Sequence, residues 1–530
     1  MSNRNYNIFF HLHTVSGITV SVLLFVIFFA GAFTLFREEI NSWESNEPVS
    51  TGKRSSSVDC DKVLEAIAVK KASLYGRTIY LTPGEKSVSI YLTPSADTTA
   101  KGAALKELEL SYDKSTGKLK DQNDSFGTGT LLYWLHFYWQ FGNPGYYLAG
   151  FVALIFFLAI VTGVLVHWKK IRSNFFVFRP KTKWKTIWTD AHTALGTIGL
   201  PFQFLYALTG AMFGLGVLVS ASGAAVLYNN DVDKVYELLY EQDNDSLGMR
   251  SPKIPKFNAL VEKAGKRWPG FTTTRLTITN YGSSTMKLSV GGEVHPREQF
   301  LGNGEIVFDM HSKKIVKERD PLEPTYTNGV WDSVFRLHYA NYGKIGSLGN
   351  YLLKTAYFLL AFLTCFVIIS GVMIWLEARN KKNIPDKRRR YNERVGAIYL
   401  AVCLTMFPVT ALAMLVAKLL PGSVNESREM ILNWTFFGGW LLLSVVFSLW
   451  KNNQLTNKFS LFTGGILGAF IPLVNGWLSG NWFWKTFGEG EYGLFSVDVL
   501  WIILSFSALF AWNKLRRIPK TAVNNSSKEP

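Results

Sequence analysis

The sequence predicts a polytopic α-helical membrane protein with about eight spans, two small α+β extracytoplasmic domains and an internal tandem duplication. The 530 residues are 48% hydrophobic and 15% aromatic, although 18% are charged, and the mean hydropathy is +0.11. These values indicate strongly apolar blocks that alternate with ordinary polar segments. The second observation is the length of the apolar blocks, and the third is a succession of motifs that occurs twice.

Each apolar block is long enough to cross a bilayer, which takes about 20 residues of helix. Lipid-exposed backbone must satisfy its hydrogen bonds internally, so these spans are helices. The blocks are 15–36, 146–167, 194–219, 351–376, 395–419, 431–450, 459–479 and 494–513. They divide the chain into span 1 (1–40), a polar domain (41–130), spans 2 and 3 (131–220), a second polar domain (221–335), span 4 (336–380), a C-terminal four-span bundle (395–513) and a tail (514–530).

The net charge of +17 is concentrated in short segments between the spans, mainly 168–189, 377–394 and the tail. Lysine and arginine favour cytoplasmic loops. We therefore expect both termini in the cytoplasm and both polar domains on the opposite side of the membrane. The charge is then a topology signal, and nucleic-acid binding is not expected. A cleaved signal peptide ending near Ala30-Gly31-Ala32 is the alternative for span 1, but its apolar core is too long.

Each polar domain is predicted to contain a helix followed by antiparallel strands, because its apolar residues alternate with period two. The expected helices lie at 63–67 and 260–263. The expected strands are 78–81, 88–92 and 108–112 in the first domain, and 275–279, 286–290 and 305–309 in the second. In each domain a turn and a further, basic strand follow. The two domains are therefore interpreted as copies of one unit.

The duplication extends into the spans. In spans 1 and 3, 18 residues separate a histidine from a glycine, His13 from Gly31 and His192 from Gly210. Eighteen residues make five helical turns, which would place both residues on one face about 27 Å apart. In spans 2 and 4 the histidine precedes the apolar run and the glycine lies near its end.

The two copies should have the same orientation and be related by a pseudo-two-fold axis along the membrane normal. Equivalent residues would then face each other. His13 would pair with His192 near the cytoplasmic face, and His136 with His338 near the outer face. Polar groups at these depths are costly and usually functional.

Such histidine pairs suggest two haems, because imidazoles from facing helices can fill both axial positions of one iron. Gly31 and Gly210 at the outer level, and Gly163 and Gly371 at the inner level, would let a flat ring approach the backbone. Helix packing is the alternative role for these glycines. Zinc or copper would want further ligands nearby. Cys60, Cys365 and Cys403 form no CxxCH motif, so the haems would be of b type.

The other histidines are weaker candidates. His167 lies four residues after Gly163, but Trp375 stands at the equivalent place in the second copy. It is interpreted as an inner-rim residue, with the role of a swapped ligand for the cytoplasmic haem held in reserve. His11 should point to the opposite side of its helix from His13. His295 and His311 are expected to be solvated.

Aromatic residues surround the outer histidine pair. They are interpreted as a belt at the membrane interface, and the alternative is an electron exit surface. They are Tyr133, Trp134, Tyr138, Trp139, Trp331, Tyr339 and Tyr342.

Over about residues 5–380 the chain resembles the PepSY-associated transmembrane family. The matching motifs are His13-Thr-Val-Ser-Gly17, Leu135-His136, Asp190-Ala-His192-Thr-Ala-Leu-Gly196, Leu208-Thr-Gly210, Leu337-His338 and Ser370-Gly-Val-Met-Ile-Trp375. The two polar domains are similar to its PepSY-type domains. Some family members are iron-regulated inner-membrane proteins. The resemblance implies a di-haem ferric-siderophore reductase type that acts on the periplasmic side of a bacterial inner membrane, with His13, His192, His136 and His338 as axial ligands.

The leading hypothesis is thus an oxidoreductase that carries electrons across the membrane through two haem b groups and reduces a ferric siderophore or chelate outside. No dinucleotide-binding fingerprint is present, so a quinol or a flavoprotein partner would donate the electrons. The four C-terminal spans depart from the family pattern. They contain no histidine and no paired charges, and they are assigned no chemistry. Two alternatives are a siderophore or peptide permease and a non-catalytic anchor for the external domains.

Overall fold

The computed structural model describes most of the chain. The described residues are 2–46, 58–69, 73–84, 87–121, 126–170, 179, 182–231, 246–251, 253–294, 301–342, 347–381, 383–420 and 425–517. The chain forms two compact units, a helical unit (1–49, 126–217 and 351–530) and a mixed unit (50–125 and 218–350). His295, the basic segment 171–178 and most of the predicted tail lie outside the described residues.

The first part of the helical unit contains the spans of the predicted duplication and the shorter helices beside them. These elements are α1 (Asn3–Thr34), α2 (Arg37–Ser45), α4 (Thr128–His136), α5 (Asn143–His167), α7 (Trp184–Ile198), α8 (Leu200–Leu227) and α12 (Leu348–Ala378). The short helices η3 (Trp139–Phe141) and η4 (Trp168–Lys170) flank α5. Helices α8 and α12 each cross the boundary between the two units.

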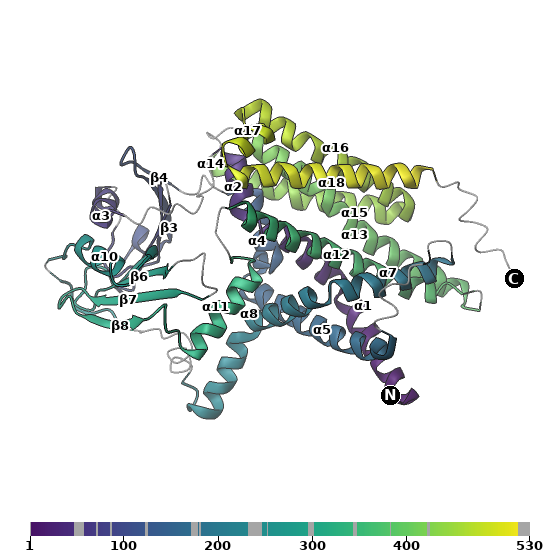
Figure 1. The fold of residues 1–530 in the computed structure, drawn as a ribbon, viewed down its shortest axis with the longest axis horizontal. Coiled ribbons are helices and arrows are strands. Elements are labelled where there is room, and N and C mark those ends of the chain that lie inside the picture. The colour runs from purple at the N-terminus through teal and green to yellow at the C-terminus, as the bar shows by residue number, and fades with distance from the viewer. Residues whose placement is uncertain are drawn as a thin grey trace. The chain divides into compact units, whose positions relative to one another are not determined.

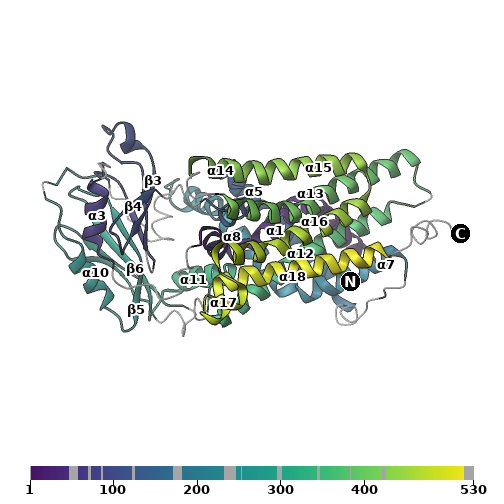
Figure 2. The same ribbon diagram turned by 90° about the horizontal axis from the view of Figure 1, so that it is seen from above.

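The C-terminal bundle of the helical unit contains α13 (Asp386–Leu419), α14 (Asn425–Asn433), the π-helical turn η5 (Trp434–Gly438), α15 (Gly439–Trp450), α16 (Asn453–Ser479), α17 (Phe483–Gly488) and α18 (Tyr492–Arg516). Its four long helices run side by side in both ribbon views (Figures 1 and 2). Glycines on α16 permit this packing. A Cβ at Gly465 would lie 2.8 Å from Leu509 of α18, and one at Gly464 would collide with Phe407 of α13.

Among the described residues, seven single helices are long and apolar enough to span a membrane, and the bent pair α7–α8 makes an eighth candidate. All eight apolar blocks recognised in the sequence fall on these helices. The chain is therefore a multi-pass membrane protein, as predicted.

The third span is not the straight helix that the sequence spacing assumed. Helices α7 and α8 meet at a bend of 70°. The break lies at Gly199, just before Pro201 in the first turn of α8. Proline donates no backbone hydrogen bond and disfavours helical geometry in the residue before it. The argument that His192 and Gly210 share one face of a single helix is therefore wrong, whereas α1 runs unbroken through His13 and Gly31.

Helix α1 is the centre of the helical unit. Its phenylalanines reach both the duplicated spans and the C-terminal bundle. Phe28 contacts Phe156 of α5 with ring centroids 5.4 Å apart. Phe33 contacts Phe358 of α12 at 5.4 Å and Trp501 of α18 at 5.7 Å. Because these aromatic side chains are large and buried, they hold the two sets of spans together.

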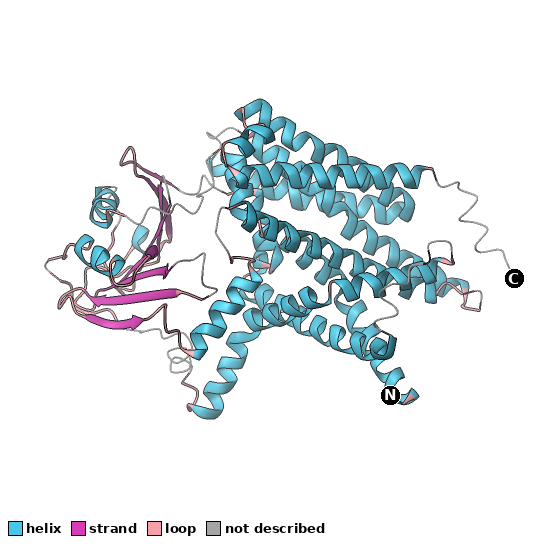
Figure 3. Ribbon diagram, viewed as in Figure 1, coloured by secondary structure: helices cyan, strands magenta, loops and turns pink. Residues whose placement is uncertain are grey.

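The mixed unit contains all described strands (Figure 3). Its elements are α3 (Cys60–Val69), β1 (Ile79–Pro83), β2 (Ser87–Leu92), the short helix η1 (Gly102–Leu105), β3 (Leu108–Asp113), β4 (Leu119–Asp121), α10 (Asn258–Gly265), β5 (Phe271–Thr279), β6 (Lys287–Val294), β7 (Asn303–Asp309), β8 (Ile315–Arg319) and α11 (Tyr326–His338). The helix and the strands predicted in each polar domain all coincide with these elements, including the basic fourth strands.

The two predicted modules do not remain separate domains. Their strands form one antiparallel sheet in the order β4-β3-β2-β1-β5-β6-β7-β8. The join pairs Ile79 with Ile278 and Leu81 with Leu276. Pairing β1 with β5 removes an exposed edge from each half. Both modules also share one hydrophobic core. Two small separate domains were therefore the wrong expectation.

The sheet faces α3 and α10, which cap each other. Asp61 of α3 accepts hydrogen bonds from the amides of Phe257, at 2.8 Å, and Asn258, at 3.3 Å. Asn258 in turn accepts from the Asp61 amide at 3.3 Å. A carboxylate at a helix N-terminus is favourable because the amides there have no partner within the helix.

Arg77 is expected to be the most sensitive polar residue of this unit. It is 2% exposed, and its guanidinium donates to the carbonyls of Ser73, Thr93, Ala103 and Lys106. Lysine cannot reach all four, so Arg77→Lys should cost about 3 kcal/mol of stability. The measurement is thermal unfolding of the full chain in detergent. The exposed Arg275→Lys variant is the control, and an equal change in both variants would contradict this role.

Candidate functional site

We call the end of the helices that carries His13 and His192 the inner end, and the end that carries His136 the outer end. At the inner end, the rings of His13 on α1 and His192 on α7 make an edge contact, with centroids 6.1 Å apart and planes inclined by 66°. The sequence placed these two histidines together, and the structure brings them together. Their role as ligands stays a prediction.

His13, His192 and His136 each place the ring nitrogen Nδ1 against a backbone carbonyl of a neighbouring helix. Nδ1 of His13 lies 2.8 Å from the carbonyl oxygen of Ala159, Nδ1 of His136 2.8 Å from that of Ile27, and Nδ1 of His192 2.9 Å from that of Val367. A carbonyl only accepts hydrogen bonds, so Nδ1 carries the hydrogen in each ring. The lone pair is then on Nε2. Histidines that bind metals usually donate their other ring N–H in this way.

A glycine stands four residues after each accepting carbonyl. These residues are Gly163 after Ala159, Gly31 after Ile27 and Gly371 after Val367. A Cβ at Gly31 would lie 2.6 Å from His136 Nδ1, one at Gly163 3.0 Å from His13 Cε1, and one at Gly371 3.2 Å from His192 Cε1. The missing side chain therefore opens the helix surface to an imidazole ring.

This contact gives three of the four glycines a role that the sequence did not suggest, since each admits a histidine ring. The expectation that all four leave room for a flat cofactor stays a prediction. Gly210 differs from the other three, since a Cβ there would meet Ala153 of α5 at 3.2 Å. Gly214, one turn later, packs against Gly150. In this part of α8 the small residues serve helix packing.

The two imidazoles of the inner end are close enough for both to reach one metal ion. Their ring centroids lie 6.1 Å apart, which is also an ordinary separation for packed rings. The described part of the chain contains no group of three or more His, Cys, Asp or Glu residues suited to a metal ion. That His13 and His192 hold a haem stays a prediction.

At the outer end, backbone carbonyls in two consecutive turns of α1 accept hydrogen bonds from residues at the C-terminal end of α4. Besides the His136 contact with Ile27, the Tyr138 hydroxyl donates to the Leu23 carbonyl at 2.6 Å. Tyr138 is buried and has a left-handed backbone, with φ of 56°. Tyr138 is thus a structural residue and does not belong to an exposed aromatic belt or exit surface. Trp139, in contrast, is exposed.

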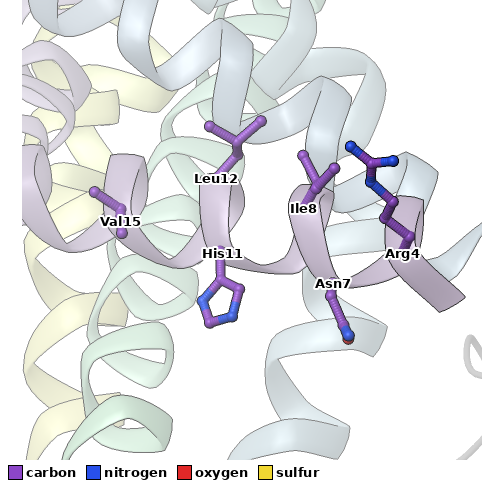
Figure 4. Close-up of a pocket in the computed structure, with 6 residues that line it drawn as sticks. All are labelled: Arg4, Asn7, Ile8, His11, Leu12 and Val15. Atoms are coloured by element: carbon purple, nitrogen blue, oxygen red, sulfur yellow. The ribbon is translucent and has the colours of Figure 1, made fainter.

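The remaining histidines are distributed as follows. His338 ends α11 in the mixed unit, so its pairing with His136 joins residues of the two units and stays a prediction. His167 ends α5. His311 is exposed, with Nε2 3.1 Å from the Ser283 carbonyl. His11 lies on an exposed face of α1, in a shallow depression that also includes Asn7 and Arg4 (Figure 4).

The C-terminal bundle contributes buried polar residues that the sequence analysis missed. Asp498 of α18 accepts from the Trp43 indole at 2.8 Å and from Asn475 at 3.0 Å. Lys418 of α13 donates to the Trp43 carbonyl and to Asn46, and its ammonium lies 4.6 Å from the Trp43 ring centre. Lys418 and Asp498 both contact Trp43, a meeting that the sequence of the separate spans does not show. Their place inside apolar runs was the available signal.

Comparison with known proteins identifies the family. The model of the PepSY-associated TM region matches residues 10–378. The chain belongs to this family. The chain is also 24% identical over 287 residues to an uncharacterized protein of Pseudomonas aeruginosa, a match that covers 53% of this chain and 71% of that protein. The family match spans every predicted ligand, from His13 to His338, and stops before the C-terminal bundle.

Proposed function

We propose that this member of the PepSY-associated TM region family is an electron carrier with two b-type haems, which reduces a ferric siderophore or chelate on the periplasmic side of a bacterial inner membrane. The observation that supports it best is the threefold contact between a histidine Nδ1, a helix carbonyl and a glycine four residues later. One such contact is an ordinary way to bury an imidazole. Three such contacts leave the Nε2 lone pair of three histidines oriented for metal binding.

The protein's contribution is to orient the imidazoles. Each carbonyl fixes one tautomer and one ring direction, and the hydrogen bond makes Nε2 a better donor. His13 and His192 would hold the inner group. His136 and, by the sequence repeat, His338 would hold the outer group. A haem held by two such imidazoles would supply one-electron transfer.

The phenylalanines of α1 lie between the two ends and keep the path apolar. Phe25 and Phe29 pack with centroids 6.0 Å apart, and Phe29 contacts Phe362 of α12 at 5.6 Å. A dry interior excludes protons and water from the path between the two sites. At the outer end, reduction would release iron because hard oxygen donors hold Fe(III) more tightly than Fe(II).

The absorption spectrum of the purified protein tests the proposal. A sharp reduced α-band and about two haems per chain are expected from two bis-histidine sites. His338→Ala should remove the outer haem and leave the inner one. A colourless protein without iron would refute the proposal, and loss of both haems in this variant would contradict two separate sites. Reduction of a ferric chelate by protein that was reduced beforehand then tests the acceptor.

A further inference from the structure

Helices α2 and α4 lie antiparallel against each other and are in contact at each turn of α2. The contacts are the Glu44 carboxyl on the Thr128 amide at 3.1 Å, the Asn41 side-chain amide on the Thr130 hydroxyl at 2.8 Å and the Arg37 guanidinium over the Tyr133 ring, 4.3 Å from its centre. Glu44 therefore caps the N-terminus of α4. At the other end of α2, Arg37 lies near the C-terminal end of α4, which carries His136.

Arg37 lies about one helical turn beyond His136, on the side away from the inner end. Tyr133 precedes His136 by three residues, so the two are neighbours on the surface of α4, about 4.5 Å apart along its axis. The contacts of α4 with successive turns of α1 show that α4 runs back towards the inner end. A guanidinium over Tyr133 is therefore farther out than the imidazole of His136.

Among the described cations at the outer end of the helical unit, Arg37 alone has no acidic partner. The other four have one each: Lys354 with Glu39, Arg428 with Glu44, Lys485 with Glu489 and Lys418 with Asp498. Arg37 is half-buried and is the first residue of α2, a position at which the helix dipole disfavours a cation. A partly buried charge is costly unless it is paired. The place of Arg37 therefore indicates an anion that the described part of the chain does not supply.

The Tyr133 ring prepares the guanidinium for an anion of defined shape. Stacking over the ring fixes the plane of the guanidinium. Its N–H groups then point along that plane, where a carboxylate can accept two parallel hydrogen bonds. Haem b carries two carboxylates on one edge of its ring and no other charged group on its periphery. A haem held by His136 would therefore bring a matching anion to this part of the helical unit.

We propose that Arg37 binds a carboxylate of the haem held by His136, and so fixes which edge of that haem faces away from the inner end. This inference rests on the proposed haem function and adds to it a residue that binds the periphery of the cofactor. The guanidinium neutralises the carboxylate, and its positive charge favours the less positive, reduced iron. Tyr133 keeps the guanidinium in place.

Titration of the haem-free full chain with two porphyrins tests this contact. The probes are haem and haem dimethyl ester, in which both carboxylates are esterified and uncharged. His192→Ala is the background, because the outer centre is expected to remain in it. The ratio of the affinity for haem to that for the ester should fall at least about tenfold when Arg37→Gln is added, the loss expected for a hydrogen bond to a charged group.

Lys485→Gln is the matched control. Lys485 also lies at the outer end, but it is exposed and paired with Glu489, so its removal should leave the ratio unchanged. Equal ratios with and without Arg37 would overturn the inference and leave the haem function intact. Weaker binding of haem and ester by the same factor would show that Arg37 only holds α2 on α4, which also overturns it. If neither porphyrin binds, the haem function is refuted and the inference with it.

The redox potential of the holoprotein gives a second readout. In Arg37→Gln the midpoint potential of the outer centre should fall, because loss of a positive charge favours the oxidised iron, while that of the inner centre should not change. Arg37→Lys keeps the charge but not the paired N–H groups, so it should retain most of the potential and lose part of the affinity. An unchanged outer potential in Arg37→Gln would contradict the proposed contact.

Melting curves distinguish a haem carboxylate from a lipid phosphate. Without haem, Arg37→Gln should melt close to the wild type, because it loses only the contact with Tyr133. Added haem should then raise the melting temperature of the wild type more than that of the variant. If haem stabilises both proteins alike, and an anionic phospholipid stabilises only the wild type, then Arg37 binds a lipid phosphate and the inference is wrong.

Discussion

Replacement of His192 by alanine should halve the haem content of the purified protein and leave the outer centre in place. The variant removes one of the two rings that lie 6.1 Å apart at the inner end. His13 alone supplies one imidazole, so the group that the pair would hold should be lost. His167, the last residue of α5, is the histidine that could replace His192. Haem per chain and the reduced α-band are the measurements. His13→Ala should have the same effect, since the two residues act on one centre.

His11→Ala is the control for these variants. His11 lies two residues before His13 on the same helix and is exposed, so its removal should change neither haem content nor spectrum. Full haem content in both His192→Ala and the double variant that also lacks His167 would disprove the inner site. Haem that is retained in His192→Ala and lost in the double variant would identify His167 as a substitute ligand.

Gly31→Ala should disrupt the outer end although it adds only one methyl group. The new Cβ would lie 2.6 Å from Nδ1 and 2.7 Å from Cε1 of His136. The ring must then move away from α1 and lose its 2.8 Å hydrogen bond to Ile27. Such overpacking costs about 1–3 kcal/mol. We expect a lower melting temperature in detergent and loss of the haem held by His136.

Gly17→Ala gives the opposite expectation on the same helix. A Cβ at Gly17 meets no atom within 4 Å, and alanine favours a helix over glycine by up to about 1 kcal/mol. This variant should keep both haems and be as stable as the wild type or more stable. Equal behaviour of the two variants would mean that the contact between Gly31 and His136 does not matter. Gly163→Ala, with its closest atom at 3.0 Å, extends the test to His13.

The C-terminal bundle holds the end of helix α2 in place. Trp43 and Glu44 form the end of α2, and their partners Lys418, Arg428 and Asp498 all belong to the bundle. Because Glu44 caps α4, the bundle fixes the helix that presents His136. The family match ends at residue 378. The contacts that hold α2 and α4 therefore come from spans that lie outside the matched region.

Much of this protein could be read from its sequence. The apolar blocks fixed the spans, because a bilayer accepts only helices of a limited length. Period-two alternation located the strands, because one face of the sheet is buried. The motif repeat placed His13 beside His192. These features depend on local chemistry and on spacing along the chain, which a single sequence displays.

Tertiary structure decided what depends on contacts between distant segments. The pairing of β1 with β5 merged two modules into one sheet, although each strand taken alone was compatible with separate domains. The use of Gly31, Gly163 and Gly371 as seats for imidazoles required knowing which helix faces which carbonyl. The meeting of Glu44, Asn41 and Arg428 joins residues almost 400 positions apart. Burial and partner identity arise only when the chain is packed, and the cost of an unpaired charge depends on both.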